Sequence, residues 1–281
     1  MYLRLLSILL AALMESFWET AGIAETTRTT NELIGPVRSV TIKKLGYSAT
    51  ENYDRAGHLI EAVIDMAHAN TATYTLFRYD QAGHLQEELV LDPSGRLILR
   101  KQIVYAQDAE GRDSASVTTS ENGGFQHAEF SLYDQRGHLW EQLWVDDSIA
   151  YKSLFDVFGR RIYSARYSKG ELFSELKHQY DAWGRLQELV IYNGHGTVSG
   201  RVANDYDDMG RRVRATTEAF GQDQQQQQKW ITTYEYDDMG NWIKELTAEH
   251  SSPSPNATAS ALPLVQERLI QYYRLTENTT P

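Results

Sequence analysis

The 281-residue chain contains no cysteine, which excludes disulfide bonds, thiolate metal sites and a cysteine nucleophile. Basic residues are also in deficit, because 27 Lys and Arg face 38 Asp and Glu and leave a net charge of −11. An acidic surface repels a nucleic-acid backbone and an anionic membrane, so neither is an expected partner. Helical periodicity is missing after residue 24, and no phosphate-binding glycine loop or Ser-His-Asp spacing is present. The sequence therefore predicts a protein without cofactors and without catalytic residues.

The first 24 residues have the pattern of a secretory signal peptide. Arg4 gives a short positive start, and the run from Leu5 to Met14 is apolar except for Ser7. Small residues at 21–24 occupy the cleavage positions, and the apolar run is too short to cross a bilayer as a helix. We therefore expect a periplasmic or secreted protein with no membrane span in the mature chain. The alternative is an amphipathic N-terminal helix that the mature protein keeps.

One short unit recurs down most of the chain: an aromatic residue, an Asp, and a Gly three residues after the Asp. Full copies are mostly 22 to 30 residues apart, a period typical of repeat architectures. The seven complete copies are Tyr53, Asp54 and Gly57; Tyr79, Asp80 and Gly83; Tyr133, Asp134 and Gly137; Phe155, Asp156 and Gly159; Tyr180, Asp181 and Gly184; Tyr206, Asp207 and Gly210; and Tyr236, Asp237 and Gly240. Two more copies, at Asp92 and Asp108, lack the aromatic residue.

Each unit predicts a tight β-hairpin. An Asp followed three residues later by Gly is typical of a type I turn, in which the carboxylate accepts backbone hydrogen bonds and Gly takes a left-handed conformation. With that Gly as a bulge, the Asp lies opposite the residue after Gly, and the aromatic residue lies opposite the second residue after Gly. The first of these positions is Arg or His in eight of the nine copies, with Asn241 as the exception. The second is an apolar Leu or Trp except at Asp113, Arg161 and Arg212.

Further turn signals lie between the Asp turns, so the chain is expected to be all-β. The predicted architecture is an array of antiparallel β-hairpin repeats that forms a long twisted or spiral sheet. We expect a polar linker over residues 25–36 and the array over residues 37–281, with loops near 222–228 and 251–263. A strand near the C-terminal end would close the array as a cap.

The Tyr-Asp-x-x-Gly-(Arg/His)-Leu unit at this spacing resembles the YD repeat of the RHS family, over roughly residues 37–250. The resemblance implies β-hairpin repeats that coil into a spiral sheet, and in long members a shell around a toxin or an internal chain. The core segment and the C-terminal effector of those long members are missing here. The chain is more similar to short secreted proteins made only of YD repeats.

Two sets of side chains recur at one repeat position each. His58, His84 and His138 follow the turn glycine, where two imidazoles would be an incomplete metal site, and so no metal is expected. The second set lies four residues after the glycine and consists of Glu61, Glu87, Glu141 and Glu188. Paired carboxylates can hydrolyse glycosides, but a periodic row is more typical of a salt-bridged stripe.

Tryptophans are the remaining candidates for a site. Trp183 lies inside a turn where its own hairpin cannot bury it, and Trp230 and Trp242 are further candidate ligand-binding platforms. Trp140 and Trp144, by contrast, are expected to fill a face between stacked sheets. The sequence thus predicts a non-catalytic binding or scaffold protein of the cell envelope or extracellular space, with a carbohydrate or protein partner. The alternatives are an accessory protein of an RHS-type toxin system and, less favoured, a carbohydrate-active enzyme that uses the Glu row.

Overall fold

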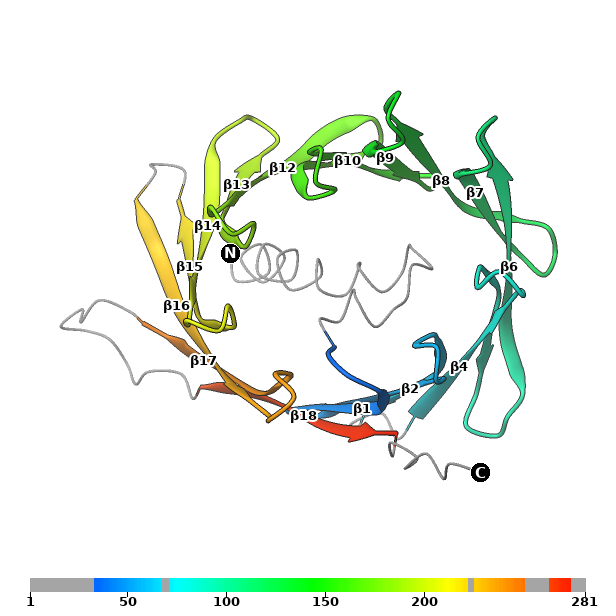
Figure 1. The fold of residues 1–281 in the computed structure, drawn as a ribbon, viewed down its shortest axis with the longest axis horizontal. Coiled ribbons are helices and arrows are strands. Elements are labelled where there is room, and N and C mark those ends of the chain that lie inside the picture. The colour runs from blue at the N-terminus through cyan, green and yellow to red at the C-terminus, as the bar shows by residue number, and fades with distance from the viewer. Residues whose placement is uncertain (1–32, 67–70, 222–224, 251–262, 274–281) are drawn as a thin grey trace, which may run out of the picture. The chain divides into compact units, whose positions relative to one another are not determined.

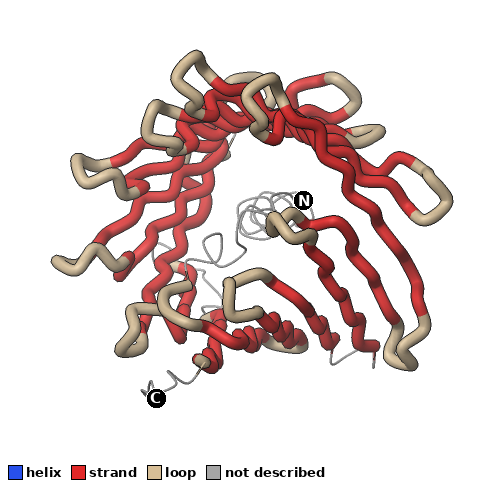
Figure 2. Tube along the Cα trace, turned by 45° about the vertical axis from the view of Figure 1, so that its right-hand side comes forward, coloured by secondary structure: helices blue, strands red, loops and turns tan. Residues whose placement is uncertain are grey.

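A computed structural model describes residues 33–66, 71–221, 225–250 and 263–273. The predicted signal peptide and most of the predicted linker lie outside these residues. In the described part all regular structure is β-strand, so the expected all-β class is confirmed (Figure 2). None of the described residues forms a helix long and apolar enough to cross a bilayer.

The described residues form eighteen strands (Figure 1). They are β1 (Val37–Lys44), β2 (Tyr47–Tyr53), β3 (Leu59–Met66), β4 (Thr71–Tyr79), β5 (Leu85–Leu91), β6 (Leu97–Gln107), β7 (Asp113–Ser120), β8 (Phe125–Tyr133), β9 (Leu139–Val145), β10 (Ile149–Phe155), β11 (Arg161–Ser168), β12 (Glu171–Tyr180), β13 (Leu186–Asn193), β14 (Val198–Tyr206), β15 (Arg212–Phe220), β16 (Gln226–Tyr236), β17 (Trp242–Glu249) and β18 (Leu264–Tyr272). β16 begins at Gln226, so residues 226–228 of the predicted loop near 222–228 belong to a strand.

The chain divides into two compact units. Unit 1 contains Met1–Arg100, Asp237–Asn241 and Arg268–Pro281, and unit 2 contains Lys101–Tyr236 and Trp242–Glu267. Unit 1 therefore combines the first five strands with the turn between β16 and β17 and with the end of β18. Unit 2 contains the strands from most of β6 to the start of β18, without the turn Asp237–Asn241.

Strand pairing leaves no end strand without a neighbour. Consecutive strands pair antiparallel along the chain, and β1 pairs with β18 as well as with β2. The antiparallel hairpins of the predicted long twisted or spiral sheet are confirmed, but the sheet is not open at its ends, because its first and last strands are hydrogen-bonded to each other. The Tyr273 amide adds to this closure by donating to the Pro36 carbonyl at 2.7 Å. Sequence periodicity could not reveal this pairing, because it reports local turns and not which distant strands meet.

The Asp turns have the predicted register. In the β12–β13 hairpin, the Asp181 amide donates to the Arg185 carbonyl, and Tyr180 lies opposite Leu186. Gly184 has a φ of +81°, the left-handed conformation that the bulge requires. Eight such turns, called Tyr-Asp turns here, join β2–β3, β4–β5, β6–β7, β8–β9, β10–β11, β12–β13, β14–β15 and β16–β17. The Asp92 copy joins β5 to β6 and belongs to the intervening turns, as its missing aromatic residue indicates.

A second bulge follows every Tyr-Asp turn, and the sequence did not predict it. In the β12–β13 hairpin Tyr180 pairs with Leu186 but Gln179 pairs with Glu188, so Gln187 is an extra residue. The other seven Tyr-Asp hairpins skip the same position. Bulges increase the local twist of a strand pair, so this repeated bulge bends the sheet at regular intervals.

The buried hydrophobic cluster of unit 1 lies where the two ends of the described chain meet. Leu33, Val37, Val40, Tyr53 and Leu59 are all less than 9% exposed, and Ile270 and Tyr272 of β18 pack against them. Leu33, which lies within the range predicted as a linker, is therefore part of this cluster.

The left-handed glycine provides a test of the turn assignment. We expect Gly184→Val to lower the free energy of unfolding by about 1–3 kcal/mol, because a β-branched residue is strained at positive φ. A Cβ there would also lie 3.3 Å from the Arg160 Nη1 atom. Arg185→Ala is expected to cost less, since it leaves the backbone of the turn unchanged. Equal losses in urea denaturation of the two variants would contradict the assignment.

Candidate functional site

Each Tyr-Asp turn is organised by its carboxylate. Oδ1 of Asp181 accepts hydrogen bonds from the amides of Trp183 and Arg185, both at 2.9 Å, and Oδ2 binds Arg185 Nε at 2.7 Å. Burial alone would raise the pKa of this carboxyl, but the bonds from Arg185 and Trp183 outweigh it and lower the pKa. The predicted pairing of the Asp with the residue after the glycine is therefore confirmed.

The cation of one turn also contacts the next repeat. Arg185 lies 4.6 Å from the ring centre of Tyr206, which precedes the following Tyr-Asp turn. Three further arginines stack in the same way, namely Arg112 on Tyr133, Arg160 on Tyr180 and Arg211 on Tyr236, at 4.6 to 5.2 Å. In unit 1, His58 stacks on Tyr79 at 4.7 Å. The side chain after the glycine thus bridges its own Asp and the aromatic ring of the neighbouring repeat.

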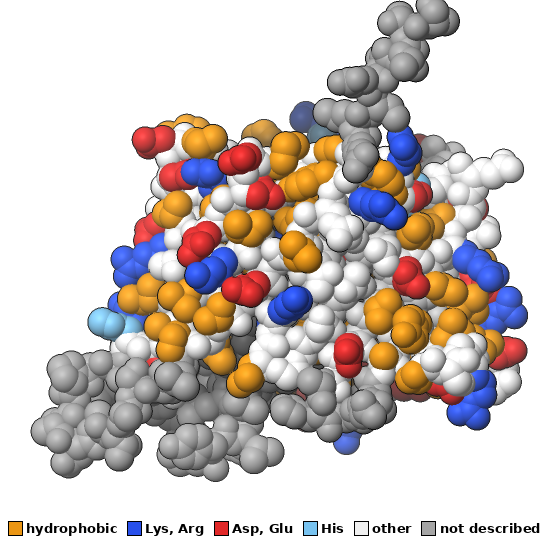
Figure 3. Space-filling view, turned by 90° about the horizontal axis from the view of Figure 1, so that it is seen from below, with side chains coloured by type: hydrophobic (Ala, Val, Ile, Leu, Met, Phe, Trp, Pro, Cys, Tyr) orange, Lys and Arg blue, Asp and Glu red, His pale blue; other side chains and the backbone are white. Residues whose placement is uncertain are grey.

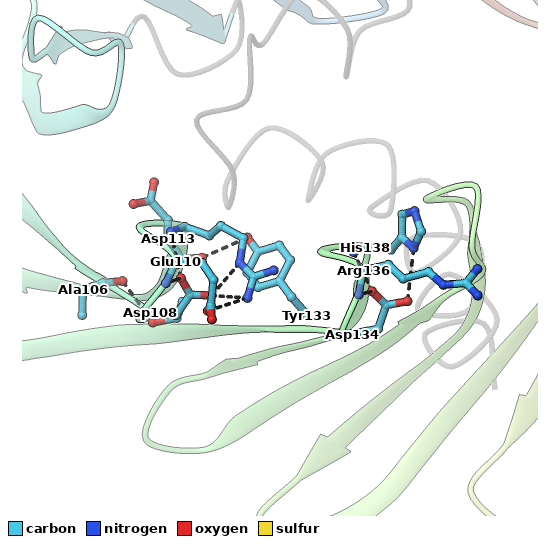
Figure 4. A network of polar contacts seen from close by, with 10 residues as sticks. Ala106, Asp108, Glu110, Asp113, Tyr133, Asp134, Arg136 and His138 are labelled. Carbon is cyan, nitrogen blue, oxygen red and sulfur yellow. Dashed lines mark hydrogen bonds and ion pairs between the residues drawn. The ribbon is translucent and has the colours of Figure 1, made fainter.

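The tyrosine hydroxyl makes a second link between repeats. Tyr133 reaches from its own hairpin to the turn that holds Asp108 and donates to the Asp113 carbonyl at 3.0 Å (Figure 4). The same bond to the second residue after the preceding glycine is made by Tyr79, Tyr180, Tyr206 and Tyr236, at 2.7 to 2.9 Å. Phe155 has no hydroxyl and is the one complete copy in which this donor is missing. The aromatic position is therefore a connection between hairpins as well as a partner for Leu.

Asn241, the exception in the sequence pattern, closes unit 1. Its Oδ1 accepts from the Ile34 amide at 2.6 Å, and its Nδ2 donates to the Ile34 carbonyl at 2.8 Å and to the Tyr272 hydroxyl at 2.7 Å. An amide side chain can do this because it carries an acceptor oxygen and a donor nitrogen side by side. Asn241 is 1% exposed, so a cation at this position would be buried. We call Ile34, Asp237, Asn241 and Tyr272 the clasp.

Tyr272 completes the clasp from the last strand. Its hydroxyl donates to Asp237 Oδ2 at 2.5 Å, which is the oxygen that binds a cation in other turns. Burial and this hydrogen bond raise the pKa of Tyr272 to about 12. The neighbouring Tyr273 hydroxyl donates to the Tyr53 carbonyl at 2.5 Å. The first repeat, the last turn and the last strand are thus held together by side chains that sequence spacing alone did not associate.

Three consecutive Tyr-Asp turns of unit 2 expose a large apolar side chain at the same position, two residues after the Asp. Phe158, Trp183 and Met209 are 77%, 79% and 76% exposed. Arg160 lies 4.9 Å from the Phe158 ring centre and Arg185 lies 4.8 Å from that of Trp183. Earlier copies have small or charged residues at this position, namely Ala56, Ala82, Glu110 and Arg136. We call Phe158, Trp183 and Met209 the turn-tip row.

The predicted tryptophan platforms differ in accessibility. Trp183 belongs to the turn-tip row and is open, Trp230 is half-buried, and Trp242 is only 7% exposed and packs edge-on against Tyr234 at 6.3 Å. Binding of a ligand by these three remains a prediction, for which Trp183 has the most available ring. Trp140 and Trp144 do not fill a space between stacked sheets, because the described strands form one sheet. Trp140 occupies a bulge and is 43% exposed, whereas Trp144 stacks on His127 at 5.1 Å.

The recurring histidines and glutamates have local partners. Nδ1 of His58, His84 and His138 lies 2.9 to 3.1 Å from the Asp of the same turn. The described residues contain no group of three side chains suited to a metal ion. In the Glu row, Glu61 binds Asn52, Glu87 binds Arg78 and Arg100, Glu141 binds Lys152, and Glu188 binds Arg201. This agrees with a salt-bridged stripe, and Figure 3 shows acidic and basic side chains intermixed with hydrophobic ones on the face in view.

Comparison with known proteins assigns no family. No protein-family model and no curated protein matches the chain. Among solved structures it is similar to the crystal structure of TcdB2-TccC3-TEV, with 13% identity and a TM-score of 0.27. That similarity covers 72% of this chain and 14% of the other. The RHS resemblance therefore remains a prediction, and the structure itself shows the antiparallel hairpin repeats.

Two porin-like proteins are also similar. The one from Bacteroides uniformis ATCC 8492 is 10% identical, with a TM-score of 0.41, and covers 85% of this chain and 98% of its own. The one from Bacteroides vulgatus ATCC 8482 is 13% identical, with a TM-score of 0.34, and covers 85% of this chain and 99% of its own. TM-scores this low do not show that these proteins share the fold of the whole chain.

The hydroxyl link can be tested in both directions. We expect Tyr206→Phe to lower the free energy of unfolding by at most about 1 kcal/mol, because the Leu186 carbonyl loses one of two side-chain donors and keeps Asn204 Nδ2 at 2.9 Å. Phe155→Tyr should raise stability by a similar amount, because the equivalent acceptor is the Leu139 carbonyl. Chemical denaturation of both variants measures this. If Phe155→Tyr lowered stability as much as Tyr206→Phe does, the repeat equivalence would be wrong.

The clasp predicts a large effect from an almost isosteric change. Asn241→Asp replaces the donor that faces the Ile34 carbonyl and buries a carboxylate beside Asp237, so we expect a loss of about 3 kcal/mol. Asn193→Asp is the matched control, because its turn bonds to the amides of His195 and Thr197 use only the acceptor oxygen. A thermal unfolding experiment in which both changes had the same effect would contradict the clasp.

Proposed function

We propose that the chain is a non-catalytic binding or scaffold protein of the cell envelope or extracellular space, and that the turn-tip row is its contact surface. The observation that carries this proposal is the exposure of Phe158, Trp183 and Met209 at one position of three consecutive turns. Soluble proteins bury most side chains of this size, and clustered exposed ones mark interaction sites. The repeat itself does not require them, since Ala or a charged residue occupies the same position in earlier copies.

The spacing of the turn-tip row suits an extended partner. Successive Tyr-Asp turns are separated by two strands, and strands in a sheet are about 4.8 Å apart, so successive tips are about 10 Å apart. The β11–β12 and β13–β14 pairings hold the three turns in one continuous sheet. The guanidinium groups of Arg160 and Arg185 contact the two rings and restrict them. A partner would therefore meet pre-positioned anchors, which reduces the entropy lost on binding.

A protein partner is favoured over a saccharide. Phe, Met and Trp are enriched in protein interfaces, and Trp is the residue type most often found at energetic hot spots. A saccharide site would combine an aromatic platform with polar groups for the hydroxyls, whereas Arg185 beside Trp183 is already paired with Asp181. A carbohydrate remains the second candidate because the Trp183 ring is flat and open.

The test combines binding screens with two tryptophan variants. Purified protein is applied to a glycan array and, separately, used to capture partners from envelope extract, followed by affinity measurement on the identified partner. We expect Trp183→Ala to weaken binding by about tenfold or more, as for a central interface residue. Trp140→Ala is the control, because Trp140 is exposed on a different hairpin. Binding that survived Trp183→Ala, Phe158→Ser and Met209→Ser would exclude the turn-tip row as the contact surface.

A further inference from the structure

Four polar side chains of unit 2 share one face of the β11–β12 hairpin. Ser164 pairs with Leu176, and alternation along β12 places His178 on the same face as Leu176. Arg166 is two residues from Ser164 and therefore also lies on this face. Arg161 joins them, because it pairs with Phe155, whose face includes Ser153, the partner of Ser164. The register thus brings two guanidinium groups, a hydroxyl and an imidazole together.

The polar atoms of this group are buried without hydrogen-bond partners. Within the described residues, Arg161 Nε, Arg166 Nε, Ser164 Oγ and His178 Nδ1 have none. Ser164 is 7% exposed. Buried donors are almost always satisfied in proteins, so four of them on one hairpin indicate a missing partner. This differs from the Tyr-Asp turns, where every arginine that follows the glycine has its own carboxylate.

Aromatic rings hold the two guanidinium groups by their faces. Arg161 lies 5.9 Å from the Phe155 ring centre, and Arg166 lies 5.9 Å from that of Tyr151 and 4.8 Å from that of Phe173. A stacked guanidinium keeps the N–H groups of its edge free for a planar acceptor. The stacking therefore orients the arginines without using their hydrogen-bonding capacity.

The centre of this face carries positive charge, and its carboxylates lie toward the edges: Glu171 opposite Ser168 at the end of the hairpin, and Glu129 opposite Trp144 of β9. Over the described strands β10 to β13, its other residues include Tyr151, Ser153, Phe155, Ser174, Leu176, Tyr180, Leu189 and Ile191, none of them acidic. Glu175 and Glu188 of the same strands fall on the opposite face. Burial and the charge of Arg161 lower the pKa of His178 to about 4, so the imidazole is neutral at pH 7. In a chain with a net charge of −11, such a face suits an anion.

We propose that Arg161, Ser164, Arg166 and His178 form a binding site for an oxyanion group, either a carboxylate or a phosphate or sulfate ester. Guanidinium edges match the paired oxygens of these groups, and the hydroxyl and imidazole add hydrogen bonds. The site shares no residue with the turn-tip row. A sequence signal supports it: Arg161 stands where most other copies of the repeat have Leu.

The test uses acetate, inorganic phosphate and sulfate as probes with the purified chain. We expect a saturable NMR shift of the His178 imidazole and a rise in its pKa, because a bound anion favours the protonated ring. The order of affinities identifies the natural oxyanion. Tighter binding of acetate indicates a carboxylate ligand, and tighter binding of phosphate or sulfate indicates an ester. Arg161→Leu should weaken the binding of the preferred probe by about tenfold, the loss expected for a charge-assisted hydrogen bond.

Arg161→Leu introduces the residue that the repeat has elsewhere, as at Leu186, and so preserves the hairpin. Arg212→Leu makes the same change at the equivalent position of another repeat and is the control. Arg166→Gln is the second variant and should also weaken binding. The absence of a saturable shift with all three probes would overturn the site, and so would equal weakening by Arg161→Leu and Arg212→Leu.

Discussion

The arginine that follows a turn glycine belongs to two repeats at once. Arg185 neutralises Asp181 of its own turn and lies on the ring of Tyr206 in the next one, and Tyr206 returns a hydrogen bond to the Leu186 carbonyl. Backbone ladders connect neighbouring strands everywhere in a sheet, but this contact connects neighbouring turns. Because it combines charge, stacking and a hydroxyl bond, the turns are fixed relative to one another and can present other side chains at defined spacing.

Residues that depart from the repeat pattern are the ones that form the clasp, the proposed oxyanion site and the turn-tip row. Asn241 replaces the cation in the last turn and binds the backbone of Ile34 in place of a ring. Arg161 replaces Leu and places a charge beside Ser164 and His178, where its buried Nε has no hydrogen-bond partner among the described residues. Trp183 enlarges a turn position that is small or charged in the early repeats. Residues that match the repeat are explained by the hairpin itself. Residues that depart from it therefore point to features that only one part of the chain has.

The sequence predicted the local structure well because that structure depends on residues close in the chain. The turn, its left-handed glycine and the pairing of Tyr180 with Leu186 follow from a spacing of a few residues. The closure of the sheet did not follow, because the contact between Ile34 and Asn241 spans 207 residues and occurs once. The extra bulge residue, such as Gln187, also escaped prediction, because no residue type marks its position. Of the candidate site residues, Trp183 was expected to be exposed and is, whereas the burial of Trp242 depends on packing against Tyr234.

The link from each turn to the next has an implication for how such a chain can change in length. Arg112, Arg160, Arg185 and Arg211 all contact a tyrosine ring of the next copy, so the four junctions that contain them are chemically equivalent. Duplication or loss of one whole copy, about 25 residues, would recreate a valid junction at the seam. The clasp has no such equivalent, because Asn241 and Tyr272 recognise one particular segment. Variation in copy number is therefore compatible with the interior of the array, while the two ends are constrained to remain as a matched pair.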